Sequence, residues 1–292
     1  MGHDIQDIKK YLERINYTSR ISNDSSTLSE LCQHHTEYNP FENLDMFGGE
    51  RKRLDFDKVY NDIIVKKRGG CCYEQNGLFY WALRKCGYEV TIVQCEAFIS
   101  EEKGYGPSFD HMALLVTCDD GSVWLTDVGW GGTGFITLLK FESDKEQIQN
   151  NGVYRLLGST QQRFLLQKLQ KTIIQVNGST KIKVKGKQWN SIYRFDIIPR
   201  KWEDFKEMCE YQQDDEDSYL IHNTICAKQS KYGSVAVRGW MTFEKMFVDP
   251  MTEKYKWRKE TKSQEELKEV LKKYFQVEIN FDLKPEAKFE AD

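Results

Sequence analysis

The stretch with the most chemical content runs from Arg68 to Phe79 and reads RGGCCYEQNGLF. Its two glycines let the backbone turn sharply and let another molecule approach closely. Cys72 follows them and opens an apolar helix. The free N–H groups and the dipole of a helix N-terminus favour negative charge, so they can lower a thiol's pKa and hold a developing oxyanion. Cys72 is therefore a candidate nucleophile; the alternative is a cysteine packed on the buried face of that helix.

A nucleophilic thiol needs a base, and His111 is the best placed of the five histidines. It begins the run HMALLVTC, which a DDG turn separates from the run SVWLTDV. A hairpin of these two runs brings His111 near residues 126–130, which include Asp127. Taken singly, His111 is typical of a strand end and Asp127 of a turn. Together with Cys72 they match a triad of nucleophile, base and orienting carboxylate.

The remaining candidates for chemistry carry weaker signals. His34 and His35 diverge by about 100° on a helix and cannot chelate one metal ion. His222 and Cys226 form half of a zinc site without a second half, so we predict no metal. Glu42 and Arg68 are either a surface ion pair or a support for the nucleophile's loop. We favour the support, because an arginine beside a nucleophile is seldom idle.

The elements that must position these residues follow from the apolar periodicity, which changes along the chain. Helical spacing covers residues 5–15, 28–35, 59–64 and 72–86, with Thr27 and Glu30 as a capping box for the second helix. Strands are indicated at 90–99, 112–116 and 193–198, with a further hairpin at Asn177-Gly178. The last third contains a helix near 202–211, strands near 235–243, and a final helix capped by Ser263 and Glu266.

This order predicts an α+β protein in three blocks. Residues 1–87 form a helical domain that carries the nucleophile. Residues 88–199 form a β-barrel domain that carries His111 and Asp127, and residues 200–292 form an α/β lid domain. A lid that covers the site would keep water away from a reactive intermediate.

Four motifs, in order, resemble the signature set of the arylamine N-acetyltransferases. They are PFENL at 40–44, RGGxCYExNGLF at 68–79, the His111 strand, and DVGxG at 127–131. The resemblance implies an N-terminal helical bundle, a central β-barrel, a C-terminal α/β lid and a cysteine-protease-like catalytic core. It also implies acetyl-CoA as the acyl donor and cosubstrate, no metal, and Cys72, His111 and Asp127 as the triad.

The same resemblance assigns the other site residues. Gly106, Ser108 and Gly129 are expected to bind the cofactor. Phe41, Phe98 and Trp130 are expected to bind the acceptor, a small arylamine or hydrazine, and Glu42 and Arg68 to support the loop. The NGSTKIKV segment occupies the position of an insertion in eukaryotic members, which points to a vertebrate-like enzyme of xenobiotic metabolism. Cys71 departs from the family, because that position usually holds a large or aromatic residue.

The expected reaction is double displacement through an acetyl-cysteine, in which His111 holds Cys72 as a thiolate. A transglutaminase-like or papain-like cysteine hydrolase remains the alternative enzyme, and a scaffold that keeps only the fold is the non-enzymatic one. A net charge of −3 argues against nucleic acid and an anionic membrane as partners. Because the first residues lack an apolar signal core, we expect a cytoplasmic protein. We also expect a monomer.

Overall fold

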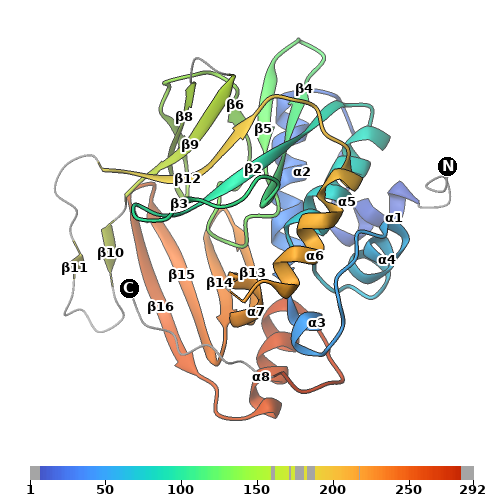
Figure 1. The fold of residues 1–292 in the computed structure, drawn as a ribbon, viewed down its shortest axis with the longest axis vertical. Coiled ribbons are helices and arrows are strands. Elements are labelled where there is room, and N and C mark those ends of the chain that lie inside the picture. Colours follow the sequence, from blue (N-terminus) through green and yellow to red (C-terminus); the bar gives the residue numbers. More distant parts are fainter. Residues whose placement is uncertain are drawn as a thin grey trace.

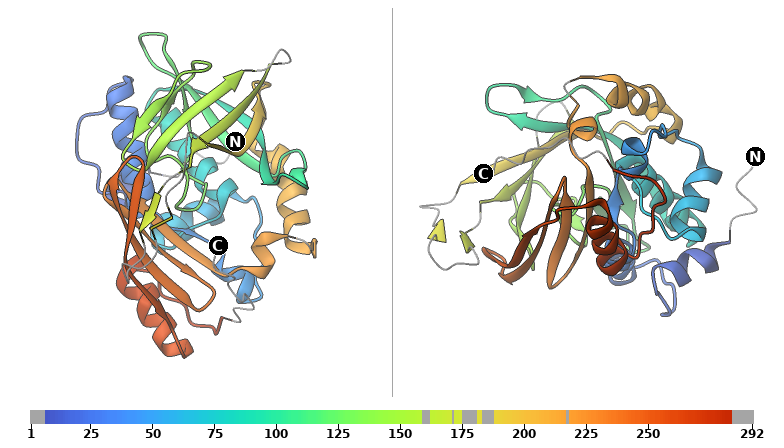
Figure 2. Two further views of the ribbon diagram at one scale, coloured as in Figure 1. Left: turned by 90° about the vertical axis from the view of Figure 1, so that its left-hand side faces the viewer. Right: turned by 90° about the horizontal axis from the view of Figure 1, so that it is seen from below.

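The computed structural model describes residues 7–158, 162–170, 172–174, 181–182, 188–216 and 218–283. Short helices fill the first part of the chain and gather on one side of the molecule (Figures 1 and 2). They are α1 (Ile8–Arg14), α2 (Ser25–Tyr38), α3 (Leu44–Phe47), α4 (Phe56–Tyr60) with a π-helical continuation over Asn61–Val65, and α5 (Cys72–Lys85).

Helix α2 begins earlier than the sequence predicted. Asp24 is its N-cap and accepts a hydrogen bond from Thr27 N at 2.8 Å, so Thr27 lies inside the first turn. The capping box of Thr27 and Glu30 was therefore wrong. Glu30 accepts a hydrogen bond from Tyr17 Oη instead. Aspartate is among the strongest N-cap residues. Ser25, Ser26 and Thr27 follow it and are also residue types favoured at N-caps, so the sequence did not single out Asp24.

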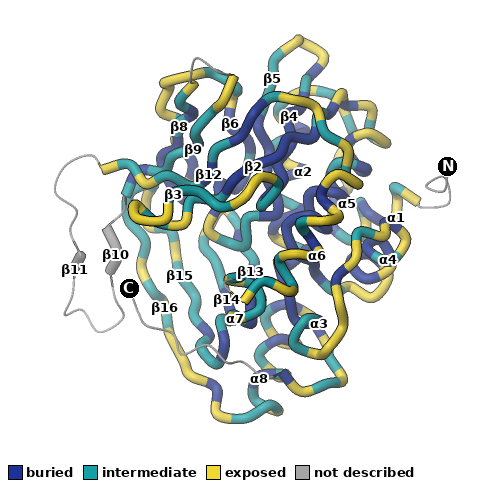
Figure 3. The backbone as a smooth tube through the Cα atoms, viewed as in Figure 1, coloured by how far each residue is buried: buried dark blue, intermediate teal, exposed yellow. Residues whose placement is uncertain are grey.

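Helix α5 occupies the centre of the main core, as Figure 3 shows by its mostly buried backbone. It begins at Cys72, as predicted, and ends at Lys85, one residue before the predicted end; Gly87 follows with a φ of +95°. Leu78 and Phe79 are fully buried on this helix. They pack with Leu28 and Leu31 of α2 and with strand residues of the barrel, so burial on several sides fixes the direction of α5.

A large antiparallel sheet forms the barrel-like centre. Its strands are β2 (Glu89–Ser100), β4 (His111–Thr117), β5 (Val123–Thr126), β6 (Leu139–Lys140), β7 (Gln147–Gln149), β8 (Gly152–Gly158), β9 (Arg163–Leu169) and β12 (Trp189–Asp196), in the order β6-β5-β4-β2-β12-β9-β8-β7. A short β3 (Gly104–Tyr105) pairs with β2. The Gln147 side chain bonds both backbone groups of Lys140, at 2.6 and 2.9 Å, which brings the two ends of the sheet together. The barrel is therefore nearly closed.

The second sheet collects strands from all three parts of the chain. It runs β1-β13-β14-β15-β16-β10-β11, with bounds Phe41–Glu42, Ile225–Ser230, Gly233–Arg238, Met241–Asp249, Thr252–Glu260, Thr172–Ile174 and Lys181–Ile182. Strands β10 and β11 pair antiparallel, as the predicted hairpin requires; its turn at Asn177-Gly178 lies outside the described residues. The predicted run at 235–243 is split by Gly239, whose φ is +56°.

Helices of the last third flank this sheet and the nucleophile's helix. They are a 3₁₀ turn (Trp202–Phe205), α6 (Lys206–Asp214), α7 (Tyr219–His222), and α8 (Gln264–Val270) with a π-helical continuation over Leu271–Phe275. Ser263 caps α8 as predicted, accepting from Glu266 N at 3.2 Å. The apolar face of α8 buries Leu267 against β13 and β14. Strand pairing and helices together define an α+β fold.

Candidate active site

Cys72 is the first residue of α5 and is 6% exposed. The loop that follows β5 lies directly against it. A Cβ added to Gly129 would stand 2.9 Å from the Cα of Cys72 and 2.8 Å from its carbonyl oxygen. Only a residue without a side chain allows this close approach. Gly129 thus brings the DVGxG segment against the predicted nucleophile.

His111 and Asp127 meet at the edge of the same hairpin. The pairing of Leu114 with Thr126 fixes the register of β4 and β5, so that His111 begins one strand and Asp127 follows the other. His111 Nε2 lies 2.7 Å from Asp127 Oδ2, and both residues are at most 4% exposed. This contact engages one ring nitrogen and leaves Nδ1 for a proton from another group.

Asn76 connects this pair to the nucleophile's helix. Its amide nitrogen donates to Asp127 Oδ1 at 2.9 Å and to Met112 O at 2.7 Å, and its oxygen accepts from Val128 N at 3.0 Å. Sequence reasoning gave Asn76 no role. Its position four residues after Cys72, on the same face of the helix, is the signal that could have found it.

The electrostatics of the resting thiol differ from the prediction. Contact with the Cys71 side chain and then burial raise the pKa of Cys72 above its ordinary value, and the thiols of Cys71 and Cys209 together with the carboxyl of Asp110 raise it further. The contact with Cys71, the largest of these causes, and burial both act against the lowering expected at a helix N-terminus. A thiolate on Cys72 therefore requires a base that takes its proton.

Aromatic rings surround the imidazole of His111. The Trp130 ring lies edge-on at 4.8 Å between centroids, and the Tyr193 ring lies at 5.4 Å. Tyr193 is fully buried, and burial followed by the nearby Asp127 raises the pKa of its phenol. Tyr193 was not predicted as part of the site, because β12 is distant in sequence. The rings restrict how the imidazole can turn.

The predicted acceptor residues divide into two groups. Phe41 and Trp130 line one small cavity of about 10 Å³ together with Asp127, and Cys72 and His111 are not among its lining residues. Phe98 is not among the residues that line it; its ring contacts Tyr105 at 5.4 Å, where β2 pairs with β3. The structure therefore brings two of the three predicted residues beside Asp127 and places the third on another part of the barrel.

Positive φ angles and close packing of the backbone explain the glycines beside Trp130. Gly129 abuts Cys72, and Gly131 and Gly132 have φ values of +78° and +86°. A Cβ on Gly132 would lie 3.0 Å from the Ala227 side chain. These glycines allow a tight turn against β13; they do not provide open space around the Trp130 ring.

The predicted cofactor residues lie on two different segments. Gly106 and Ser108 lie on the loop before His111, whereas Gly129 lies against Cys72. The Ser108 hydroxyl donates to Glu96 Oε1 at 3.0 Å, and Gly106 N donates to Ala97 O at 2.8 Å. A Cβ on Gly106 would stand 2.5 Å from Asp110 Oδ2, so this loop packs tightly before it reaches the histidine.

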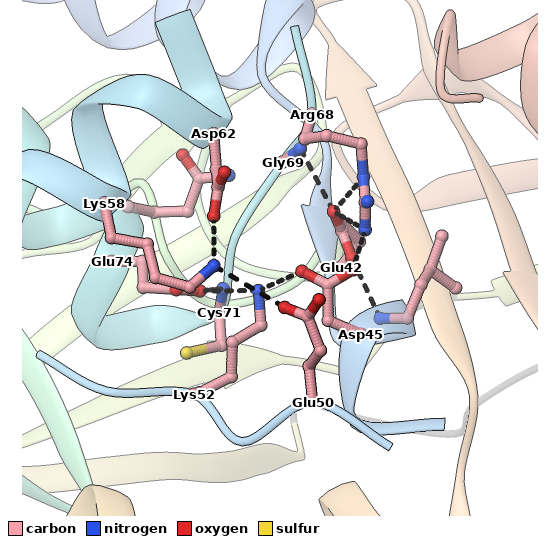
Figure 4. A network of polar contacts seen from close by, with 12 residues as sticks. Glu42, Asp45, Glu50, Lys52, Lys58, Asp62, Arg68, Gly69, Cys71 and Glu74 are labelled. Carbon is pink, nitrogen blue, oxygen red and sulfur yellow. Dashed lines mark hydrogen bonds and ion pairs between the residues drawn. The ribbon is translucent and has the colours of Figure 1, made fainter. Parts of the chain in front are cut away.

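The two predicted supporting residues form a buried network, shown in Figure 4. Glu42 is fully buried, and its Oε1 accepts from Arg68 Nε at 3.0 Å and from Gly69 N at 3.2 Å. The other oxygen of Glu42 accepts from Leu44 N. Arg68 also bonds Asp45 at 2.7 Å. The pair is therefore not a surface ion pair, and it fixes the glycine turn that precedes Cys72.

No group of three or more potential metal ligands occurs among the residues that the structure describes. The described helices also include none with the length and hydrophobicity that crossing a bilayer requires.

Known proteins are similar to this sequence along nearly its whole length. A family model for N-acetyltransferases matches residues 24–284. The liver isozyme of arylamine N-acetyltransferase from Gallus gallus is 32% identical over 290 residues, covering 95% of this chain and 98% of that protein. Arylamine N-acetyltransferase 1 of Homo sapiens is 30% identical over 283 residues, covering 96% and 97%.

Solved structures show the same fold. The arylamine N-acetyltransferase of Salmonella typhimurium superposes with a TM-score of 0.80 at 22% identity, over 92% of this chain and 90% of that one. The Mycobacterium marinum arylamine N-acetyltransferase, solved in complex with CoA, superposes with a TM-score of 0.79 at 22% identity, over 93% of each chain.

The fold and these relatives define an acyltransferase. The chain belongs to the arylamine N-acetyltransferase family, and its similar proteins include vertebrate enzymes, as the motif resemblance implied.

Proposed function

We propose that this enzyme transfers an acetyl group from acetyl-CoA to the nitrogen of an arylamine or hydrazine, through an acetyl-cysteine on Cys72. The observation that carries the proposal is the 2.7 Å contact of His111 Nε2 with Asp127, beside the start of α5. Family membership supports the reaction, and a relative solved with CoA supports the donor.

In the first half-reaction, Cys72 Sγ attacks the thioester carbonyl of acetyl-CoA while its proton passes to His111 Nδ1. First-turn N–H groups of α5 stabilise the oxyanion. Cys71 N is not one of them, because it donates to Glu74 Oε2 at 2.9 Å. The tetrahedral intermediate then breaks its carbon–sulfur bond to CoA, and His111 returns the proton to the leaving thiolate.

In the second half-reaction, the amine nitrogen attacks the acetyl-cysteine carbonyl. His111 takes a proton from the amine and returns it to the Cys72 sulfur as the carbon–sulfur bond breaks. Asp127 holds the imidazole in one orientation and stabilises the imidazolium. Because its surroundings raise the pKa of Cys72, the thiolate depends on His111 as the acceptor of its proton.

Phe41 and Trp130 are proposed to contact the acceptor, since both line the cavity at Asp127. Gly106 and Ser108 are proposed to lie along the donor's path, Gly129 to allow the acetyl group close to Cys72, and Phe98 to contact the acceptor. We also propose a helical bundle, a lid and a cysteine-protease-like core, with the three domain boundaries given above. The monomeric state and the cytoplasmic location are proposals as well. Gln212 of α6 donates to Asp110 at 2.7 Å, which supports a covering role for the last third.

Family membership does not favour the cysteine hydrolase, and one test separates double displacement from direct transfer. The purified enzyme is mixed with acetyl-CoA and isotopically labelled CoA without any amine. A covalent acetyl-enzyme predicts exchange of label into acetyl-CoA, and parallel double-reciprocal lines when an amine is then varied. Absence of exchange together with converging lines would instead indicate direct transfer in a ternary complex.

A further inference from the structure

Lys52 is a buried cation close to the nucleophile's helix. It lies between α3 and α4 and is 3% exposed. Its Nζ stands 3.3 Å from Asp45 Oδ2 and 3.3 Å from Glu74 Oε2 (Figure 4). Burial lowers the pKa of Lys52, but Glu74, Glu42 and Asp45 together raise it further than burial lowers it. Lys52 is therefore charged, and its charge is balanced by carboxylates rather than by water.

Helix α6 fixes the backbone of Lys52 from the other side. Lys52 N donates to Gln213 Oε1 at 2.7 Å, and Lys52 O accepts from Gln213 Nε2 at 3.0 Å. Cys209 Sγ lies 4.0 Å from the same carbonyl oxygen. Because both backbone groups of Lys52 are engaged, its side chain is aimed at α5 by contacts with the last third of the chain.

Glu74 connects Lys52 to the backbone just before the nucleophile. The oxygen that pairs with Lys52, Oε2, also accepts from Cys71 N at 2.9 Å. Cys71 is the N-cap of α5, and Cys72 follows it directly. One carboxylate oxygen thus joins the cation to the N-cap, whereas Glu42 and Arg68 hold the preceding Gly69. The two halves of the network meet at Asp45, which bonds both cations.

We propose that Lys52 is a positioning residue for the Cys72 nucleophile, acting through Glu74 and the N–H of Cys71. The inference rests on the proposed role of Cys72 and goes beyond the triad, since Lys52 touches neither His111 nor Asp127. A cation at this place has two effects. It holds the Glu74 oxygen against the N-cap, and its charge favours the thiolate that forms on attack.

A charge cycle tests the proposal. Lys52→Met keeps the alkyl chain and removes the cation. Glu74→Gln keeps an oxygen that can accept from Cys71 N and removes the anion. The double variant removes both charges together. Lys58→Met is the matched control, because the ion pairs of Lys58 are with Asp62 at 2.6 Å and Glu50 at 3.7 Å, and neither partner lies on α5.

Two quantities are measured for each variant: kcat/KM for acetyl-CoA, and the pH dependence of iodoacetamide alkylation at Cys72, located by peptide mass. The charged and titratable groups that act on Cys72 in the structure are Cys71, Cys209 and Asp110, and His111 is its proposed base; none of these is changed. We expect Lys52→Met to lower kcat/KM at least tenfold and to move the alkylation inflection to higher pH.

Glu74→Gln should move that inflection to lower pH, since it removes a negative charge. The double variant should return both quantities to within about threefold and a few tenths of a pH unit of the unmodified enzyme, and Lys58→Met should leave them unchanged. An inflection that is unmoved in Glu74→Gln, or a double variant as impaired as Lys52→Met, overturns the proposal. If Lys52→Met does not fold, the Glu74→Gln and double variants still decide it.

The alkylation measurement does not depend on the acyl donor. If the unmodified enzyme accepts no acetyl group from acetyl-CoA, the proposed function fails, while the shifts of the alkylation inflection still report whether Lys52 acts on Cys72. The two failures are therefore distinguishable.

Discussion

Asn76 lies one turn after Cys72 on helix α5, and its amide nitrogen is 2.9 Å from the Asp127 carboxylate. The same side chain bonds Met112 O and Val128 N, so it joins the helix that carries the thiol to both strands that carry the base and acid. The relative position of the nucleophile and the histidine therefore depends on one buried amide as well as on the fold.

Asn76→Ala should lower both stability and activity. Removal of the amide takes a partner from Met112 O and Val128 N and one of two donors from Asp127 Oδ1, which keeps Gly129 N. Each buried group left unpaired costs about 1–3 kcal/mol. We expect the free energy of unfolding in urea to fall by about 3 kcal/mol or more, and kcat/KM for acetyl-CoA to fall at least tenfold. Unchanged kcat/KM in a folded variant would show that Asn76 does not align the site.

Asp127→Asn should abolish most of the activity while the protein stays folded. An amide cannot stabilise the imidazolium of His111, and it can favour the wrong tautomer of the ring. By analogy with carboxylates in other triads, we expect a loss of about 10³–10⁴-fold in kcat. Circular dichroism would establish the fold of the variant. Turnover within tenfold of the unmodified enzyme would remove Asp127 from the mechanism.

Substitutions of Cys71 and of Cys72 should have different effects on acetyl transfer. Contact with Cys71 is the largest cause that raises the pKa of Cys72. Cys71→Ala should therefore move the alkylation inflection of Cys72 to lower pH and keep acetyl transfer, whereas Cys72→Ser should have no transfer. If Cys72→Ser is active and Cys71→Ala is not, the nucleophile is the other cysteine.

Trp130 should limit the size of the acceptor. Its ring stands edge-on to His111 and lines the cavity at Asp127, so it narrows the approach to the acetyl-cysteine. We expect single-ring planar amines and hydrazines to be preferred over fused-ring amines by about ten- to two-hundred-fold in kcat/KM. Trp130→Ser should reduce this ratio and leave acetylation of Cys72 by acetyl-CoA almost unchanged. The same ratio in both proteins would leave Trp130 with a packing role alone.

His35 should make the protein sensitive to acid. It is fully buried, accepts from Tyr11 Oη through Nδ1 and donates through Nε2 to Gln75 Oε1, and burial lowers its pKa to about 3. The unfolded chain binds a proton near pH 6.5, where the folded one does not, so stability is lost as pH falls from about 6.5 toward 3. His35→Gln should unfold in urea with a smaller pH dependence over that range. An equal pH dependence in both proteins would contradict the assignment.

The sequence predicted the parts of the site that depend on local signals. The DDG turn between β4 and β5 predicted a hairpin register that brings Asp127 close to His111. The two glycines before Cys72 indicated the start of α5. Asn76 and Tyr193 were not predicted, because their partners are distant in sequence and no local pattern records them. Lys52 stands in the charged run ERKRLD, which is typical of an exposed loop, and only the tertiary fold buries it.

The central claim is a covalent acetyl group on Cys72, and intact mass spectrometry after mixing with acetyl-CoA alone tests it most directly. We predict a gain of one acetyl group, located on Cys72 by peptide mapping, reversed by addition of an arylamine, and absent from Cys72→Ser. No mass gain in the folded enzyme, or an acetyl group on another residue that persists in Cys72→Ser, would contradict the account.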